Sequence, residues 1–206
     1  MSIRFVFRVP ALMLAVVMPA LAGCEASEPA PEVYVLGHGA SVGQSDLSQL
    51  NRPVIDVMPV RIPDYLDNKD IVARQPNGQI VASRRARWGE RLSVGLTRAV
   101  TTSLAARSPG LTVVNTPMEA ARWRVAIDIV AFEIQSGQCV LAGRWTVWSG
   151  SGEKKLRDRT FSMSSRVDDG TDAATVAAMT VLVDRLAADV SASFVDGMEP
   201  SRVASH

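Results

Sequence analysis

The chain has 206 residues, which is enough for one domain with a small appendage, and its hydrophobic fraction of 47% is typical of a globular protein. The 22 Lys and Arg residues nearly balance the 21 Asp and Glu residues. The chain therefore lacks the general basic field that favours nucleic acid, and we expect no nucleic-acid partner. Two cysteines exclude a disulfide framework and a four-cysteine zinc site, and two histidines leave few groups for catalysis. We expect neither an enzyme nor a bound metal or cofactor.

The first segment, residues 1–23, has the plan of a secretory signal peptide. Arg4 and Arg8 give it a basic start, residues 9–23 carry no charge, and small residues close it. The uncharged run is shorter than the roughly 20 residues that a membrane-spanning helix needs. We therefore predict a cleaved leader and not a permanent membrane span.

The end of this leader, Leu21-Ala22-Gly23-Cys24, resembles the lipobox of bacterial lipoproteins. Chains with this motif are cut before the cysteine and carry a diacylglyceryl group on its sulfur, so Cys24 is the expected lipidation site. The next residue is Glu25 and not the aspartate that commonly retains such proteins in the inner membrane. We expect a lipid-anchored protein on the periplasmic face of the outer membrane, with residues 24–31 as a polar tether.

Hydrophobic periodicity divides the rest of the chain into strands and two helices. Asn77-Gly78 between two apolar runs predicts a hairpin, whereas Trp88, Leu92 and Leu96 recur at helical spacing. The expected elements are, in chain order, strands at 33–36, 54–58, 71–74 and 79–83, a helix at 88–107, strands at 111–114, 123–129, 139–147 and 154–166, and a helix at 171–196.

These elements predict a single α+β domain over residues 32–197, followed by a tail at 198–206. Their order is β-rich, helix, β-rich, helix. We expect a mainly antiparallel sheet with the two long amphipathic helices packed on one face, because this arrangement buries both apolar stripes.

Three local patterns resemble ligand or catalytic sites but lack essential parts of them. The glycine-rich segment 37–43 has no Gly-Lys-Ser/Thr ending, so we interpret it as a loop. Asp64, Asp67 and Asp70 lack the glycine and terminal glutamate of a calcium loop, which favours a turn with solvated acids. Cys139 is interpreted as a buried, inert thiol, because a redox or nucleophilic role would need a neighbouring base.

Two other patterns are compatible with surface contacts. The segment 84–87 (Arg-Arg-Ala-Arg) and Arg91 form a basic cluster, which we interpret as a solvated helix start. Contact with lipid head groups or an acidic partner is the alternative. In a regular strand Trp148 falls on the opposite face from Trp145, where its indole would contact a ligand or partner or belong to a second core layer.

One stretch, residues 57–74, carries a family resemblance. It contains Pro63-Asp64-Tyr65-Leu66, then an acidic turn and Ile71-Val72-Ala73-Arg74. With Trp88, the strand 141–147 and the final Ala-rich helix, it resembles the ABC-type transport auxiliary lipoprotein family, which includes the paraquat-inducible protein C lipoproteins. The segment after Trp88 departs from the family pattern in lacking its usual proline.

The resemblance implies a non-catalytic subunit of a transporter that moves lipids between the two membranes. Its implied partners are a mammalian-cell-entry (MCE) domain protein with an inner-membrane permease and ATPase, and a ring-like homo-oligomer would match a symmetric tunnel. The turn of Pro63, Asp64, Tyr65 and Leu66 is the first expected contact surface. The alternative is that Tyr65 and Leu66 fold under the sheet while Pro63 and Asp64 shape the turn.

Two rival functions remain open at this point. A periplasmic escort lipoprotein for an outer-membrane or secretion component would carry the same anchor. A hydrolase would use His38 with a serine or with Cys139, and we disfavour it because the surrounding motifs are missing.

Overall fold

The computed structural model describes residues 29–39 and 52–195; the leader 1–23, the lipobox and the tail 198–206 lie outside the described residues. Over the described ranges the chain forms eight strands and two helices. They are β1 (Glu32–Tyr34), β2 (Val54–Val57), β3 (Asp70–Arg74), β4 (Ile80–Trp88), α1 (Leu92–Arg107), β5 (Thr112–Val114), β6 (Trp123–Gln135), β7 (Gln138–Ser149), β8 (Lys155–Arg166) and α2 (Asp172–Val195).

The longest strands, β6, β7 and β8, pair antiparallel in chain order. On its other edge β6 takes two short parallel neighbours, β2 near its start and β3 near its end. β4 pairs antiparallel with β3, while β1 and β5 add parallel pairings at β4 and β2. The expectation of an α+β fold is confirmed; the sheet is mixed, with its longest ladders antiparallel.

The parallel pairings arise because one stretch of chain follows β6 twice in the same direction. After β2, the backbone N–H of Met58 donates to Val125 O (2.9 Å) and that of Arg61 to Ile127 O (3.0 Å). The chain then leaves the sheet through residues 62–69 and returns to β6 as β3. Alternation in the sequence reports which residues are buried, not strand direction, so it could not reveal this path.

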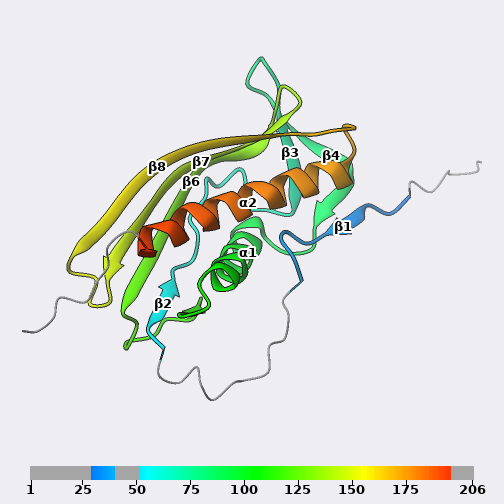
Figure 1. The fold of residues 1–206 in the computed structure, drawn as a ribbon. Helices are drawn as coiled ribbons and strands as arrows, with labels where there is room; N and C mark the ends of the chain where they lie inside the picture. Colours follow the sequence, from blue (N-terminus) through cyan, green and yellow to red (C-terminus); the bar gives the residue numbers. More distant parts are fainter. Residues whose placement is uncertain (1–28, 40–51, 196–206) are drawn as a thin grey trace, which may run out of the picture.

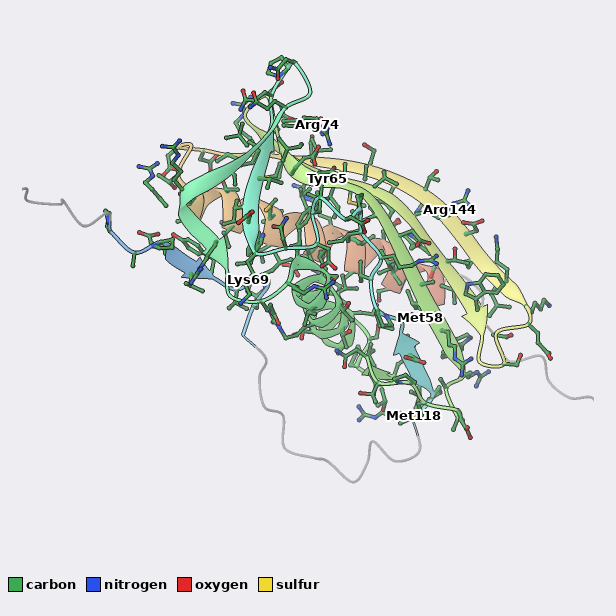
Figure 2. The ribbon with its side chains drawn as sticks, turned by 180° about the vertical axis from the view of Figure 1, so that it is seen from behind. Met58, Tyr65, Lys69, Arg74, Met118 and Arg144 are labelled. Carbon is green, nitrogen blue, oxygen red and sulfur yellow. The ribbon has the colours of Figure 1, made fainter. Side chains whose placement is uncertain are left out.

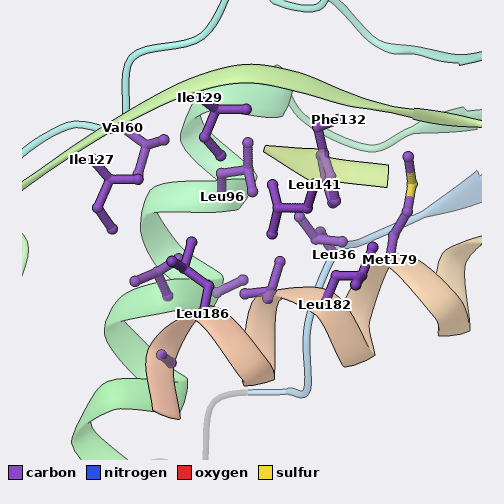
Figure 3. Packing of buried hydrophobic residues seen from close by; sticks show 14 of the residues in the cluster. Leu36, Val60, Leu96, Ile127, Ile129, Phe132, Leu141, Met179, Leu182 and Leu186 are labelled. Atoms are coloured by element: carbon purple, nitrogen blue, oxygen red, sulfur yellow. The ribbon is translucent and has the colours of Figure 1, made fainter. Parts of the chain in front are cut away.

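Both helices pack on one face of the sheet. Figure 1 shows α2 lying along the concave side of β6, β7 and β8, with α1 beside it. Their apolar stripes meet the inward residues of the strands, and each fully buried leucine or phenylalanine contributes about 1.5–3 kcal/mol. The core residues in Figure 3 include Leu96, Phe132, Leu141, Leu182 and Leu186. No helix among the described residues is long and apolar enough to cross a membrane.

The start of α1 differs from its expected position. Trp88 is the last residue of β4, where its backbone N–H donates to Lys69 O (2.7 Å), and α1 begins at Leu92. Both Trp88 and Leu92 are buried, so their four-residue spacing imitates a helical turn. The prediction of a helix from residue 88 was wrong by one turn because the chain reaches Trp88 in an extended conformation.

The acidic turn before β3 supports α1. Asp67 accepts a hydrogen bond from the backbone N–H of Ser93 (3.3 Å) and pairs with Arg91. A carboxylate here satisfies a free N–H and favours the positive end of the helix dipole. Asp64 and Asp70 are exposed, as expected for solvated acids, but that interpretation was wrong for the half-buried Asp67.

Candidate partner-binding surface

Ser103 on α1, Asp184 on α2 and His38 lie close together, but not in the order of a catalytic triad. The hydroxyl of Ser103 donates to Asp184 Oδ1 (2.7 Å), while His38 Nδ1 lies 3.7 Å from Asp184 Oδ2 and its side chain is 74% exposed. In a nucleophilic triad the histidine bridges serine and carboxylate. Here the carboxylate itself binds the serine, so this arrangement does not activate a nucleophile.

Cys139 lies elsewhere, at the start of β7. It is fully buried, and its Sγ faces Thr175 O on α2 at 3.7 Å. Burial raises the pKa of the Cys139 thiol to about 11. The buried, inert cysteine expected from the sequence fits this environment. Among the described residues there is also no group of three or more His, Cys, Asp or Glu side chains that could hold a metal ion.

We predict that Cys139 reacts slowly with a disulfide reagent such as DTNB in the folded protein. Its raised pKa lowers the thiolate fraction about 100-fold relative to an ordinary cysteine, and burial blocks access as well. A Cys24→Ser chain leaves Cys139 as the single thiol, so the reaction can be followed before and after unfolding in guanidinium. Equal rates in the two states would show that the site is open.

The turn at Pro63–Leu66 is fastened to β6. The Tyr65 hydroxyl donates to Glu133 Oε2 (2.6 Å) and accepts from Arg74 Nη2 (2.9 Å), while Arg74 Nε also binds Glu133. Gln135 Nε2 donates to Glu133 Oε1 (3.0 Å), and the Glu133 carboxylate is fully buried. These bonds join three segments of the fold, so we assign Tyr65 a structural role.

The other residues of the turn divide between the core and the surface. Leu66 is buried in the main core, Pro63 is half-buried and Asp64 is exposed. The sequence left open whether Tyr65 and Leu66 would fold inward, and the structure places both in internal contacts. A partner contact at this turn stays a prediction for Asp64 and Pro63.

Trp148 lies on the sheet face turned away from the helices. Trp145, three residues earlier, points inward and donates from Nε1 to Asp189 Oδ2 on α2 (2.8 Å). Trp148 stands opposite Arg124 in the β6–β7 ladder and is half-buried. In Figure 2, which views the molecule from behind, Met58 and Arg144 are seen on this outer side.

A groove of about 340 Å³ opens beside Trp148. Its walls include Met58, which is exposed, and the side chains of Arg61 and Arg124. Lys155 Nζ lies 5.6 Å from the Trp148 ring centroid, a distance typical of a cation–π contact. The groove lies across β6, between residues 58–61 along one edge of that strand and Trp148 on β7 at its other edge.

The charges in the groove are internally balanced. Arg61 pairs with Asp128, and Arg124 Nε lies 3.7 Å from Asp56 Oδ2. The groove therefore offers apolar surface from Met58 and Trp148 inside a polar rim. That combination is typical of a surface that accepts an apolar side chain of a partner protein.

The basic cluster also lies in a different element from the one expected. Arg84, Arg85 and Arg87 are exposed on β4, whereas Arg91 precedes α1 and is held by Asp67. The interpretation of the cluster as a helix start was therefore wrong for three of its four arginines. The structural contribution of Glu133 was missed altogether, and its only local signal is a carboxylate within the apolar run 129–134.

The family model of the ABC-type transport auxiliary lipoprotein component matches residues 34–191, and the chain belongs to this family. The resemblance seen in the sequence is thereby confirmed, and the protein is an auxiliary lipoprotein of transport systems. No curated protein matches the sequence.

Two solved structures share the fold at low identity. An uncharacterized protein is 18% identical with a TM-score of 0.68, covering 81% of this chain and 99% of its own. A Xanthomonas campestris protein of the DUF330 family is 18% identical with a TM-score of 0.59, covering 80% of this chain and 92% of its own.

Proposed function

We propose that this protein is the outer-membrane-anchored, periplasmic lipoprotein of an MCE-type ABC system that moves lipids between the inner and outer membranes. It acts there without catalysis, as a docking and anchoring component. Membership of the auxiliary lipoprotein family over residues 34–191 carries the proposal. The lipobox at Leu21–Cys24 supports the anchor, and Glu25 after it supports the outer membrane.

The anchor gives docking a physical advantage. A diacylated and further acylated Cys24 would hold the domain stably at the membrane, since each buried methylene contributes about 0.8 kcal/mol. The short tether then keeps the domain at high local concentration beside the end of a periplasmic tunnel. Any ATP hydrolysis belongs to the partner ATPase, because the sequence has no Gly-Lys-Ser/Thr phosphate loop.

The groove between Met58 and Trp148 is our proposed docking surface for the MCE partner. Its occupant is an apolar side chain of that partner, with the polar rim of Arg61 and Arg124 around it. A ring-like homo-oligomer would present several copies of the groove to a symmetric tunnel.

The full-length lipoprotein tests this proposal. The native envelope is crosslinked, the protein is purified in mild detergent, and the co-purifying proteins are identified. Recovery of an MCE protein with its permease and ATPase supports the transport function. Recovery of an outer-membrane barrel or a secretion component alone would replace it with the escort function.

Two substitutions in the groove test the docking surface in the same assay. We expect Trp148→Ala combined with Met58→Ser to lower recovery of the MCE partner about 10-fold or more, because it removes the apolar anchors of the contact. Val94→Ser is the matched control, since Val94 is also an exposed apolar residue but lies on α1. Unchanged recovery with a normal melting temperature would move the docking surface elsewhere.

A further inference from the structure

One edge of the domain combines exposed apolar residues with exposed arginines. β1 pairs parallel with the end of β4, and Val33 stands directly opposite Arg87. The side chains of Val33 and Val35 are both close to Gly89: a Cβ there would lie 3.3 Å and 3.4 Å from their methyl groups. Val33 is 57% exposed and Val35 is 54% exposed, so this edge offers apolar surface beside a cation.

The arginines of this edge have no carboxylate partner within the ranges that the structure describes. Arg84, Arg85 and Arg87 are exposed, and no ion pair within 4.0 Å joins any of them to a described acid. The three charges fall within four residues of one strand and repel one another. An external anion would relieve this repulsion.

Three carboxylates lie near these arginines and keep their negative charge. Glu32 accepts from the Tyr34 hydroxyl, and Asp172 accepts from Ser83 Oγ (3.2 Å). Asp70 stands opposite Arg87 in the β3–β4 ladder, although the two side chains form no ion pair within 4.0 Å. None of the three arginines is held in an ion pair within 4.0 Å among the described residues, so their guanidinium groups can bind an outside anion.

The short segment of chain between Cys24 and β1 indicates which partner lies nearest to this edge. Glu32, the first residue of β1, follows Cys24 by eight residues. Even a fully extended chain of that length spans only about 28 Å. If Cys24 carries the lipid, as the proposed function requires, this edge is held close to the membrane surface.

We propose that Val33, Val35, Arg84, Arg85 and Arg87 form a membrane-facing surface that binds anionic phospholipid. The arginines bind the phosphate groups, and the valines enter the head-group region beside them. This second contact fixes the orientation of the domain on the membrane, which the tether by itself would not fix. The partner is the lipid surface and not an acidic protein, because the lipid anchor brings that surface within reach of this edge first.

The test separates this surface from the anchor. A mature chain with Cys24→Ser carries no lipid, and its binding is measured by flotation with two kinds of vesicle. One kind is phosphatidylcholine alone, and the other also contains phosphatidylglycerol. We expect binding to the anionic vesicles only, weakening as salt is added.

Charge removal should abolish most of this binding. Each arginine near an anionic surface changes the partition by about 5-fold, so we expect Arg84→Gln, Arg85→Gln and Arg87→Gln together to lower it roughly 100-fold. The matched control changes three other exposed basic residues to Gln; they lie before β8, at its end and on α2. They are Lys154, Arg166 and Arg185.

Two results would overturn the proposal. One is equal vesicle binding by the triple variant and the control. The other is a triple variant that loses the MCE partner in the crosslinking assay but still floats with anionic vesicles, which would make the cluster a protein contact. Neither result contradicts the transport function, so the two proposals fail separately. Circular dichroism of each variant checks that it is folded.

Discussion

Replacing Gly143 with alanine is expected to lower the free energy of unfolding by about 3 kcal/mol. Gly143 lies on β7 opposite Ile129, at the point where the β6–β7 ladder shifts register. A Cβ added there would lie 2.2 Å from the carbonyl oxygen of Asp128 and 2.9 Å from Ile129 Cα. Both atoms belong to the backbone of the central strand, so no side chain can move aside, and the two strands must separate. Chemical denaturation monitored by tryptophan fluorescence measures the loss.

Gly110→Ala is the matched control for this prediction. A Cβ at Gly110 meets no atom within 4 Å, so this change should leave the unfolding midpoint almost unaltered. If Gly143→Ala were as stable as Gly110→Ala, the close approach of β7 to β6 would be wrong. If both variants lost stability, the cause would instead be a general effect of replacing glycine with alanine.

The same bulge explains where the sequence-based prediction of β6 stopped. Burial alternates regularly from Trp123 to Ile129, and a strand of that length was predicted. Ile129 and Phe132 are both buried although they are three positions apart, which regular alternation forbids. The register shift inserts one extra residue into β6, and Val130 is exposed there. The Phe132 side chain therefore points into the core again, and the strand continues to Gln135. Periodicity identifies regular strands, and a bulge is invisible to it.

The candidate surface was partly predictable from the same alternation of side chains along a strand. Trp148 could be placed on the outer face because an odd separation from Trp145 sends two side chains to opposite sides. The groove beside it also needs Met58, which lines the same groove because residues 58–61 run along β6. That is a long-range arrangement. Asp67 was missed as a helix cap for this reason too, since its partner Ser93 is 26 residues away.

The turn between β2 and β3 links the core to the outer surface. Leu66 enters the core, Asp67 binds the start of α1, and Tyr65 binds Glu133 on β6. One short segment thus ties together the helix, the central strand and the strand pair that carries the basic edge. These internal contacts explain why the turn has this sequence, and the stretch of chain just before it lines the groove beside Trp148.

Replacing Glu133 with glutamine is expected to lower the free energy of unfolding by about 2 kcal/mol at neutral pH. Removing one partner of a buried ion pair costs about 3–5 kcal/mol, and water at Arg74, whose side chain is 35% exposed, reduces the loss. Tyr65→Phe removes only the hydroxyl and should cost about 1 kcal/mol.

The pH dependence distinguishes this ion-pair effect from simple repacking. Burial alone would raise the pKa of the Glu133 carboxyl, but hydrogen bonds from Arg74, Tyr65 and Gln135 outweigh it and hold that pKa below its ordinary value of 4.5. The carboxylate therefore stabilises the fold above pH 4.5, and this contribution fades as the pH falls through the lower pKa of the folded state. Glutamine has no such titration, so the difference in unfolding free energy between the parent protein and Glu133→Gln should shrink below that pH. A difference that stays constant from neutral to acidic pH would mean that the charge of Glu133 does not stabilise the turn, and that Tyr65 is held there by packing alone.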